Sequence, residues 1–261
     1  MTEPEIYYEV HGEKEPYLLL VHGMLSSRSQ WMPNIDGLRR FCSPVVVELF
    51  GHGRSPSPED PLYYGPENYM REFEKVRQKV GVEKWFICGQ SLGASLTLRY
   101  AIFHPDHIIA QIFTNSRSAT SGAASDRGPG MLARRIEELG RRAIDEFPLH
   151  PAKGRHLSEE IRNALMEDVN RVTVMGFQNT ATYTITNEGI QSQLPKTGIP
   201  TLLIAGRYDK TFYPHLDDVK EMIPGLEVIV LDAGHAVNIG QPENFNEAVK
   251  EFITKHREER K

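Results

Sequence analysis

The stretch FICGQSLGASL, residues 86–96, decides how the surrounding chain is interpreted. An apolar run ends at a glycine, and Ser91 then stands between Gly89 and Gly93 in the pattern G-x-S-x-G. The residues before the serine predict a buried strand, and those from Leu92 onward predict a helix. So tight a turn needs small residues beside the serine and raises its hydroxyl above the sheet edge. The alternative is an ordinary serine that caps an ordinary helix, and the rest of the chain has to decide between the two.

Short apolar runs alternate with helical patterns along most of the chain. The apolar runs are mostly continuous in Val, Ile and Leu, as expected when both faces of a parallel sheet are buried. The strand candidates are Ile6–Val10, Tyr17–Val21, Pro44–Leu49, Lys84–Cys88, Ile108–Thr114, Thr201–Ala205 and Leu226–Leu231. The helical patterns fall at about 30–40, 67–80, 92–103, 214–223 and 242–257. This order predicts an α/β fold, a doubly wound and mostly parallel sheet with helices on both faces.

Residues 117–196 interrupt this alternation, because no buried strand is evident there. A Gly-, Ser- and Ala-rich stretch comes first, followed by two amphipathic helical patterns. The first pattern puts four apolar residues on one helical face: Leu132, Ile136, Leu139 and Ile144. We expect a sheet core formed by residues 1–116 and 197–261, with 117–196 inserted as a helical cap. Decorative packing of these helices is the alternative, but their place just after a strand end favours a lid.

Composition excludes several functional classes. The 261 residues carry a formal net charge of −5 with acids and bases interspersed, which argues against a nucleic-acid partner. No apolar run reaches the ~18–20 residues that span a bilayer, and the N-terminus lacks a signal-peptide pattern, so we expect a cytoplasmic protein without a membrane partner. Cys42 and Cys88 are interpreted as reduced core thiols. No metal-ligand spacing or phosphate loop is evident, so no metal or cofactor is expected; the oligomeric state stays open, a homo-oligomer included.

Two later stretches supply a base and an acid for the serine. The stretch GRYDKTF places Asp209 just beyond one predicted strand, and GHAVNIGQPENF places His235 beyond the next. Because the carboxyl ends of parallel strands share one sheet edge, these residues are expected to meet Ser91 there. The pattern predicts Ser91 as nucleophile, His235 as its base and Asp209 as the orienting acid. Asp232 is a rival acid but lies too close to His235 in sequence, and Asn115 occupies a further strand end but is neutral.

Acyl transfer also needs donors for a developing oxyanion. The backbone N–H of Leu92, directly after the serine, should supply one. A second is expected from Met24, because Gly23 lets the chain turn back after a buried strand. We interpret His22 as a residue that hydrogen-bonds to the backbone and shapes this turn, rather than as a participant in the chemistry.

Five ordered motifs resemble the α/β-hydrolase fold superfamily: HGMLSSRSQW, ELFGHGRS, GQSLGAS, GRYDKTF and GHAVNIGQPENF. Together they cover nearly the whole chain apart from the cap. The resemblance implies the same triad and the same two oxyanion donors. Within the superfamily the chain is most similar to small-molecule hydrolases with a helical cap, namely enol-lactonases, carboxylesterases and meta-cleavage C–C hydrolases. Glu48 departs from the aspartate that the family usually has there, at a position that is normally structural.

These features predict a serine hydrolase whose partner is a small-molecule ester or lactone of a partly apolar carboxylic acid. C–C bond hydrolysis of a meta-cleavage diketone would use the same triad. Arg117, Arg134 and Arg135 could then bind a substrate carboxylate, although a solvated basic face is the plainer interpretation. The alternative of another class is a non-catalytic small-molecule receptor on the same scaffold.

Residues that flank the motifs are candidates for contact with the substrate. From the core these are Leu25, Trp31, Phe212 and Val237. From the cap, Met175, Phe177 and Tyr183 are candidates as well. Each of them could equally be plain core.

Overall fold

The computed structural model describes residues 3–116, 119, 129–154, 157–185 and 198–257. The described chain forms a seven-stranded sheet in the order β1-β3-β2-β4-β5-β6-β7. Its strands are β1 (Tyr8–Val10), β2 (Tyr17–Val21), β3 (Ser43–Val47), β4 (Trp85–Gly89), β5 (Ile108–Thr114), β6 (Thr201–Gly206) and β7 (Glu227–Leu231). Only the pairing of β1 with β3 is antiparallel, and the other pairings are parallel. The predicted mostly parallel sheet is therefore confirmed.

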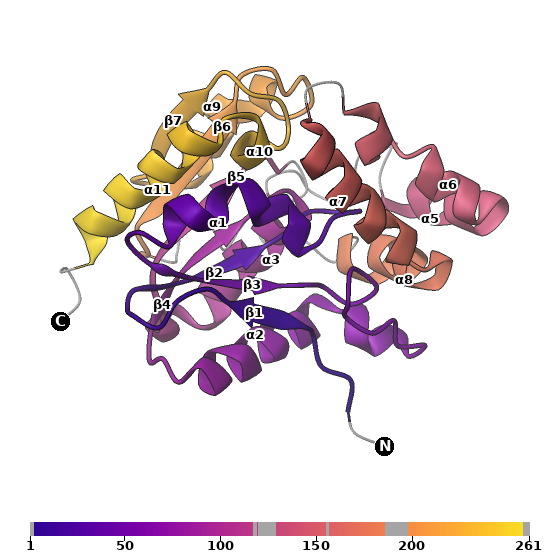
Figure 1. The fold of residues 1–261 in the computed structure, drawn as a ribbon, viewed down its shortest axis with the longest axis horizontal. Helices are drawn as coiled ribbons and strands as arrows, with labels where there is room; N and C mark the ends of the chain where they lie inside the picture. Colours follow the sequence, from indigo (N-terminus) through magenta and orange to yellow (C-terminus); the bar gives the residue numbers. More distant parts are fainter. Residues whose placement is uncertain (1–2, 117–118, 120–128, 155–156, 186–197, 258–261) are drawn as a thin grey trace.

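Helices cover both faces of the sheet (Figure 1). They are α1 (Met32–Leu38), α2 (Pro66–Val80), α3 (Leu92–Phe103), α9 (Leu216–Met222), α10 (Val237–Gly240) and α11 (Pro242–His256). Leu19 and Val21 of β2 pack into one core with α2 and α3, whereas Leu18 and Leu20 pack into another with α1 and α11. Both faces of β2 are thus buried, which explains why its sequence is continuously apolar.

The described part of the insertion between β5 and β6 is helical and lies beside the sheet (Figure 1). Its main elements are α5 (Pro129–Leu139), α6 (Arg141–Asp145), η4 (Pro151–Lys153), α7 (Glu159–Arg171) and α8 (Val174–Asn179). The face predicted across the first pattern is divided between α5 and α6, because Gly140 takes φ +53°. Ile136 and Ile144 remain buried, but Leu139 is 37% exposed. The predicted boundaries at 117 and 196 lie outside the described residues.

A separate core joins these helices to the sheet. Ile136, Val169 and Phe177 pack together with Leu25, which belongs to the loop after β2. The helix α7 also packs against η1 (Arg28–Trp31), a short helix that continues the same loop. The helices of the insertion therefore rest directly on the segment expected to hold an oxyanion donor.

The two cysteines, Cys42 and Cys88, are buried free thiols, as predicted. Across the described residues, none of the helices combines the length and the apolar composition needed to cross a membrane.

Candidate active site

Ser91 occupies a sharp turn between β4 and α3. Its backbone has φ 52° and ψ −112°, a conformation that costs a non-glycine residue of order 1–3 kcal/mol. The flanking glycines are required by close approach. A Cβ on Gly89 would lie 2.2 Å from the carbonyl oxygen of Gly93, and a Cβ on Gly93 would lie 2.2 Å from that of Val21. The local sequence thus permits a strained serine at the carboxyl edge of the sheet.

His235 and Asp209 meet at the same edge. The Nδ1 atom of His235 lies 2.7 Å from Oδ2 of Asp209. The other carboxylate oxygen accepts hydrogen bonds from the backbone N–H and the hydroxyl of Thr211, at 2.9 and 2.7 Å, and from the N–H of Phe212 at 3.2 Å. Burial alone would raise the pKa of Asp209, but the hydrogen bonds from His235 and Thr211 hold it well below the ordinary value. A fixed, ionised carboxylate therefore orients the imidazole.

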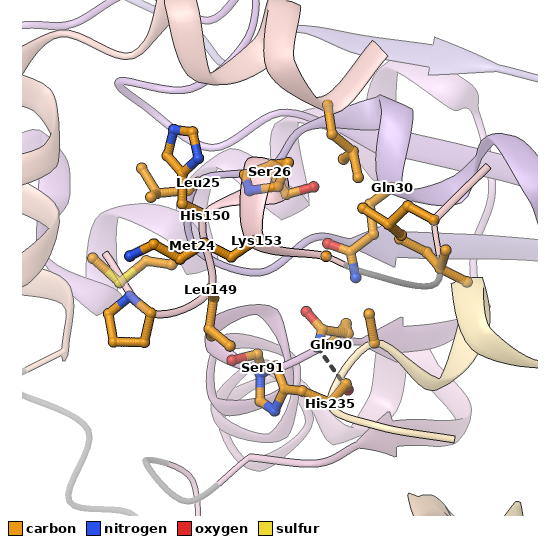
Figure 2. A pocket seen from close by; sticks show the side chains of 17 residues that line it. Met24, Leu25, Ser26, Gln30, Gln90, Ser91, Leu149, His150, Lys153 and His235 are labelled. Carbon is orange, nitrogen blue, oxygen red and sulfur yellow. Dashed lines mark hydrogen bonds between the residues drawn. The ribbon is translucent and has the colours of Figure 1, made fainter. Parts of the chain in front are cut away.

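The opposite nitrogen of His235 is available for chemistry. Among the described residues, Nε2 is a buried atom without a hydrogen-bond partner. His235 and Ser91 line one cavity of about 220 Å³, which Figure 2 shows from close by. Gln90, the neighbour of Ser91, donates its side-chain N–H to the backbone oxygen of His235 at 3.2 Å. This bond holds the histidine loop, the segment between β7 and α10 that contains His235, beside the serine. The hydroxyl-bearing Ser91 and the unpartnered ring nitrogen of His235 therefore belong to the same cavity.

Two further polar residues surround the acid and the base. Asn115 accepts the N–H of Gly206 at 2.9 Å and donates to the oxygen of Gly234 at 3.3 Å, so it ties the ends of β5 and β6 to the histidine loop. Asp232 is more than half exposed and pairs with Arg207 at 3.2 Å. The structure therefore places Asp209, rather than Asp232, against the imidazole.

The loop after β2 lies opposite the turn at Ser91. Met24 lines the cavity, and Leu92 is the first residue of α3, where backbone N–H groups have no partner within the helix. His22 shapes this loop as expected: its Nδ1 lies 2.7 Å from the oxygen of Gly23, and its Nε2 accepts the N–H of Leu49 at 3.0 Å. Burial lowers the pKa of His22 to about 4, so the ring is neutral.

A buried amide network holds the same loop from behind. The side-chain oxygen of Gln30 accepts the N–H of Gly23 at 3.0 Å, and its nitrogen donates to Asn238 at 3.4 Å. Asn238 donates to the side chain of Asn34 at 3.1 Å, and Asn34 donates in turn to Asn246 at 3.2 Å. The network links the loop to α10 and α11, which follow His235 in the chain. Sequence reasoning missed it because isolated amides form no recognisable pattern.

The predicted substrate contacts from the core divide into two groups. Leu25 lines the cavity, as expected. Trp31, Phe212 and Val237 are fully buried in the sheet cores and are not among the residues that line it. Trp31, for example, packs against the ring of Phe245 with 6.2 Å between centroids. Proximity to the motif residues in the sequence did not place these side chains in the cavity, because they point into the cores between the helices and the sheet.

The insertion contributes one wall of the cavity, from residues that were not predicted as substrate contacts. This wall consists of Pro148, Leu149, His150, Pro151, Lys153, Gly154, Leu157 and Leu165. The proposed cap contacts lie elsewhere: Phe177 is buried in the cap core, whereas Met175 and Tyr183 are 37% and 38% exposed. The proline-rich PLHP stretch was the available signal, although prolines alone do not show which way a loop faces.

The arginines considered for a substrate carboxylate do not line this cavity. Arg134 and Arg135 are exposed on α5, and Arg135 pairs with Glu146 at 2.5 Å. Arg117 lies outside the described residues. The plainer interpretation, a solvated basic face, fits the two described arginines.

Two polar features of the described residues lie outside the cavity. Glu48 is 1% exposed and accepts the backbone N–H groups of Arg28 and Arg54, which fits the structural role expected of it. Glu74, His104 and His107 place three potential metal-ligand atoms within 4.8 Å of one another, away from the cavity wall. Both carboxylate oxygens of Glu74 already accept hydrogen bonds from the Arg77 guanidinium.

Comparisons with known proteins identify the fold that carries this site. A family model of the α/β hydrolase fold matches residues 16–242. A Bacillus subtilis protein provisionally named 2-succinyl-6-hydroxy-2,4-cyclohexadiene-1-carboxylate synthase is 24% identical, over 91% of this chain and 90% of its own length. A provisionally named carbamate hydrolase of Agrobacterium fabrum is 27% identical, over 95% of this chain and 98% of its own. Among solved structures, the enol-lactonase from Burkholderia xenovorans LB400 superposes with a TM-score of 0.82 at 20% identity, over 95% and 96% of the two chains.

Proposed function

The chain belongs to the α/β-hydrolase fold family, and we propose that it is a serine hydrolase that cleaves an ester or lactone of a small, partly apolar carboxylic acid through an acyl-enzyme. One observation carries the proposal. The vacant Nε2 of His235 and the strained Ser91 border the same cavity, while Nδ1 is held at 2.7 Å by Asp209. In this proposal residues 117–196 act as the cap of the site.

Acylation begins when His235 Nε2 accepts the proton of Ser91 Oγ as that oxygen attacks the carbonyl carbon. The carbonyl oxygen becomes an oxyanion, for which the N–H groups of Leu92 and Met24 are the proposed donors. The protonated imidazole then gives its proton to the leaving alcohol oxygen. The C–O bond breaks, and an ester between the acid and Ser91 remains.

Deacylation repeats these steps with water. His235 takes one proton from the water as its oxygen attacks the acyl carbon, and a second oxyanion forms at the same place. The imidazole returns the proton to Ser91 Oγ, and the carboxylic acid leaves. Asp209 keeps its negative charge throughout and stabilises the imidazolium, so the net reaction consumes one ester and one water.

The cavity supports a small and partly apolar substrate. Its volume is about 220 Å³, and Met24, Leu149, Leu157 and Ile239 contribute apolar side chains to its wall. The named relatives include a carboxylesterase of Bacillus subtilis, 23% identical over 93% of this chain. That name supports attack on a carbonyl carbon, but the acid itself is set by the cavity and not by the fold.

The test combines covalent labelling with turnover. A fluorophosphonate should label the wild-type protein at Ser91, and p-nitrophenyl esters of short acids should be hydrolysed. Ser91→Ala should abolish both signals, with its fold checked by circular dichroism. Ester cleavage that survives this substitution would overturn the mechanism. Absence of labelling in the wild type would favour the receptor, and turnover of coloured ring-fission diketones alone would favour the C–C hydrolase.

A further inference from the structure

Ser26 presents an unused hydroxyl to the cavity. It lies in the loop after β2 and lines the cavity wall, although only 6% of the residue is exposed. Its Oγ is one of the buried side-chain atoms for which the described residues provide no hydrogen-bond partner. A buried hydroxyl without a partner is unfavourable, and one that also borders a cavity is placed to bind a polar group of a ligand there.

The residue before Ser26 shares a positive φ with Ser91. Among the described residues, Leu25 and Ser91 are the two non-glycine positions with positive φ, at 53° and 52°. Both line the cavity. Strain of this kind persists where the surrounding structure enforces it, and it concentrates at ligand sites. The loop conformation that precedes Ser26 is therefore part of the construction of the cavity.

Ser26 belongs to a polar end of the cavity that is separate from the reacting groups. In Figure 2, Ser26 and His150 lie on one side, Ser91 and His235 lie on the other, and Met24 and Leu149 lie between them. The Nδ1 atom of His150 accepts the N–H of Ala152 at 3.2 Å, so the neutral ring carries its proton on Nε2 and offers a donor. None of the residues that line the cavity is an aspartate or a glutamate.

Lys153 is less suited to receive a substrate group at this end. Its ammonium donates to the backbone oxygens of Glu146 and Phe147, at 2.5 and 3.0 Å, and so holds the segment that directly follows α6. The hydroxyl of Ser26 has no comparable engagement among the described residues.

We propose that Ser26 Oγ donates a hydrogen bond to a second oxygen of the substrate, located in the acyl group away from the reacting carbonyl. In an ester the alcohol leaves for solvent while the acyl group is still bound to Ser91, so we place the acyl group at the polar end that contains Ser26. The enzyme accordingly prefers esters of acids that carry a distal carbonyl or carboxylate oxygen over esters of plain alkyl acids. This inference rests on the proposed hydrolase function.

A matched pair of substrates tests the inference. p-Nitrophenyl 4-oxopentanoate and p-nitrophenyl pentanoate differ only at C4, where a carbonyl group replaces a methylene. Ser26→Ala should lower kcat/KM for the oxo ester about tenfold, the loss of one hydrogen bond, and change that for the alkyl ester less than twofold. The quantity compared is the ratio of kcat/KM for the oxo ester to kcat/KM for the alkyl ester, in the wild type and in Ser26→Ala. Because both enzymes act on the same two esters, the intrinsic reactivity of the esters cancels in this comparison. The mono-p-nitrophenyl ester of glutaric acid, measured in parallel, distinguishes a ketone from a carboxylate preference.

The controls separate this inference from the proposed function and from folding. Ser27→Ala removes the neighbouring hydroxyl, which is buried but does not line the cavity, so it should leave the substrate ratio unchanged. Ser26→Ala should unfold at or above the wild-type temperature, since it removes an unpaired buried group. If fluorophosphonate labels Ser91 but Ser26→Ala lowers both esters equally, or neither, the inference is wrong and the hydrolase remains. If the wild type hydrolyses none of the esters and resists the label, the proposed function fails first.

Discussion

Acidification between pH 7.5 and 5.0 should destabilise this protein through two histidines that do not take part in the chemistry. His22 and His52 are fully buried, and their rings lie 5.3 Å apart. Burial lowers the pKa of His22 from 6.5 to about 4 and that of His52 from 6.5 to about 3. Protonation of His22 would place an N–H where Nε2 now accepts the N–H of Leu49. Both rings must therefore stay neutral in the folded chain.

The sign and size of the effect follow from proton binding. Below pH 6.5 the unfolded chain binds a proton at each histidine that the folded chain does not, so the free energy of unfolding falls as the pH falls. A pH of 5.0 lies 1.5 pH units below 6.5, the pKa of each histidine in the unfolded chain. This corresponds to roughly 2 kcal/mol per residue, or about 4 kcal/mol for the pair. The contribution is complete at pH 7.5 and is lost progressively below pH 6.5, down to about pH 4 for His22 and about pH 3 for His52.

Urea unfolding at pH 7.5 and 5.0 measures this loss. His52→Asn keeps a donor near the oxygen of Phe50, which Nδ1 of His52 contacts at 3.0 Å, but removes one titrating ring. The variant should lose about 2 kcal/mol less than the wild type between the two pH values, whatever its absolute stability. An unchanged pH dependence in His52→Asn would refute the reasoning.

Three substitutions test other parts of the site. Asp209→Asn should lower kcat by roughly 10³–10⁴-fold with the fold intact, because the imidazole loses its orienting charge; a loss under tenfold in steady-state assays would contradict this. Gln30→Ala should lower kcat about tenfold with KM within twofold, since it releases the N–H of Gly23, while Asn246→Ala, at the far end of the amide network, should change kcat little. Gly93→Ala should destabilise by about 3 kcal/mol in urea unfolding, because its Cβ would lie 2.2 Å from a β2 carbonyl oxygen. Gly65→Ala, whose Cβ would meet nothing nearer than 3.5 Å, is its control, and equal losses in both variants would argue against close approach as the cause.

Regular elements and strand ends were predictable because burial imposes a period on the sequence. Strand β5 begins and ends at the predicted residues, Ile108 and Thr114, and α3 spans the predicted Leu92–Phe103. Asp209 and His235 were found for the same reason, since parallel strands bring their carboxyl ends together. The direction of individual side chains was not predictable in this way. Phe212 follows Asp209 closely yet packs with Leu203 and Val219 in the sheet core.

The cavity wall contributed by the insertion was not predicted, for a related reason. His150 and its neighbours lie in short turns, where no repeating pattern marks a buried face. Gly140 likewise reads as part of one continuous helical face until its φ of +53° is known. Such features depend on contacts between distant segments, which a single sequence does not display.

Leu25 has a consequence for attempts to change what this protein accepts. Its side chain packs among Ile136, Val169 and Phe177 of the insertion, and the residue directly follows Met24 in the loop after β2. An insertion transplanted from a relative would have to provide apolar side chains that pack around Leu25. Without them, the loop after β2 would lose its present conformation. Chimeras of this kind should therefore alter turnover rate and selectivity together. Evolution of new selectivity is then easiest at Leu149, His150 and Pro151, which line the cavity and do not belong to the hydrophobic cluster around Leu25.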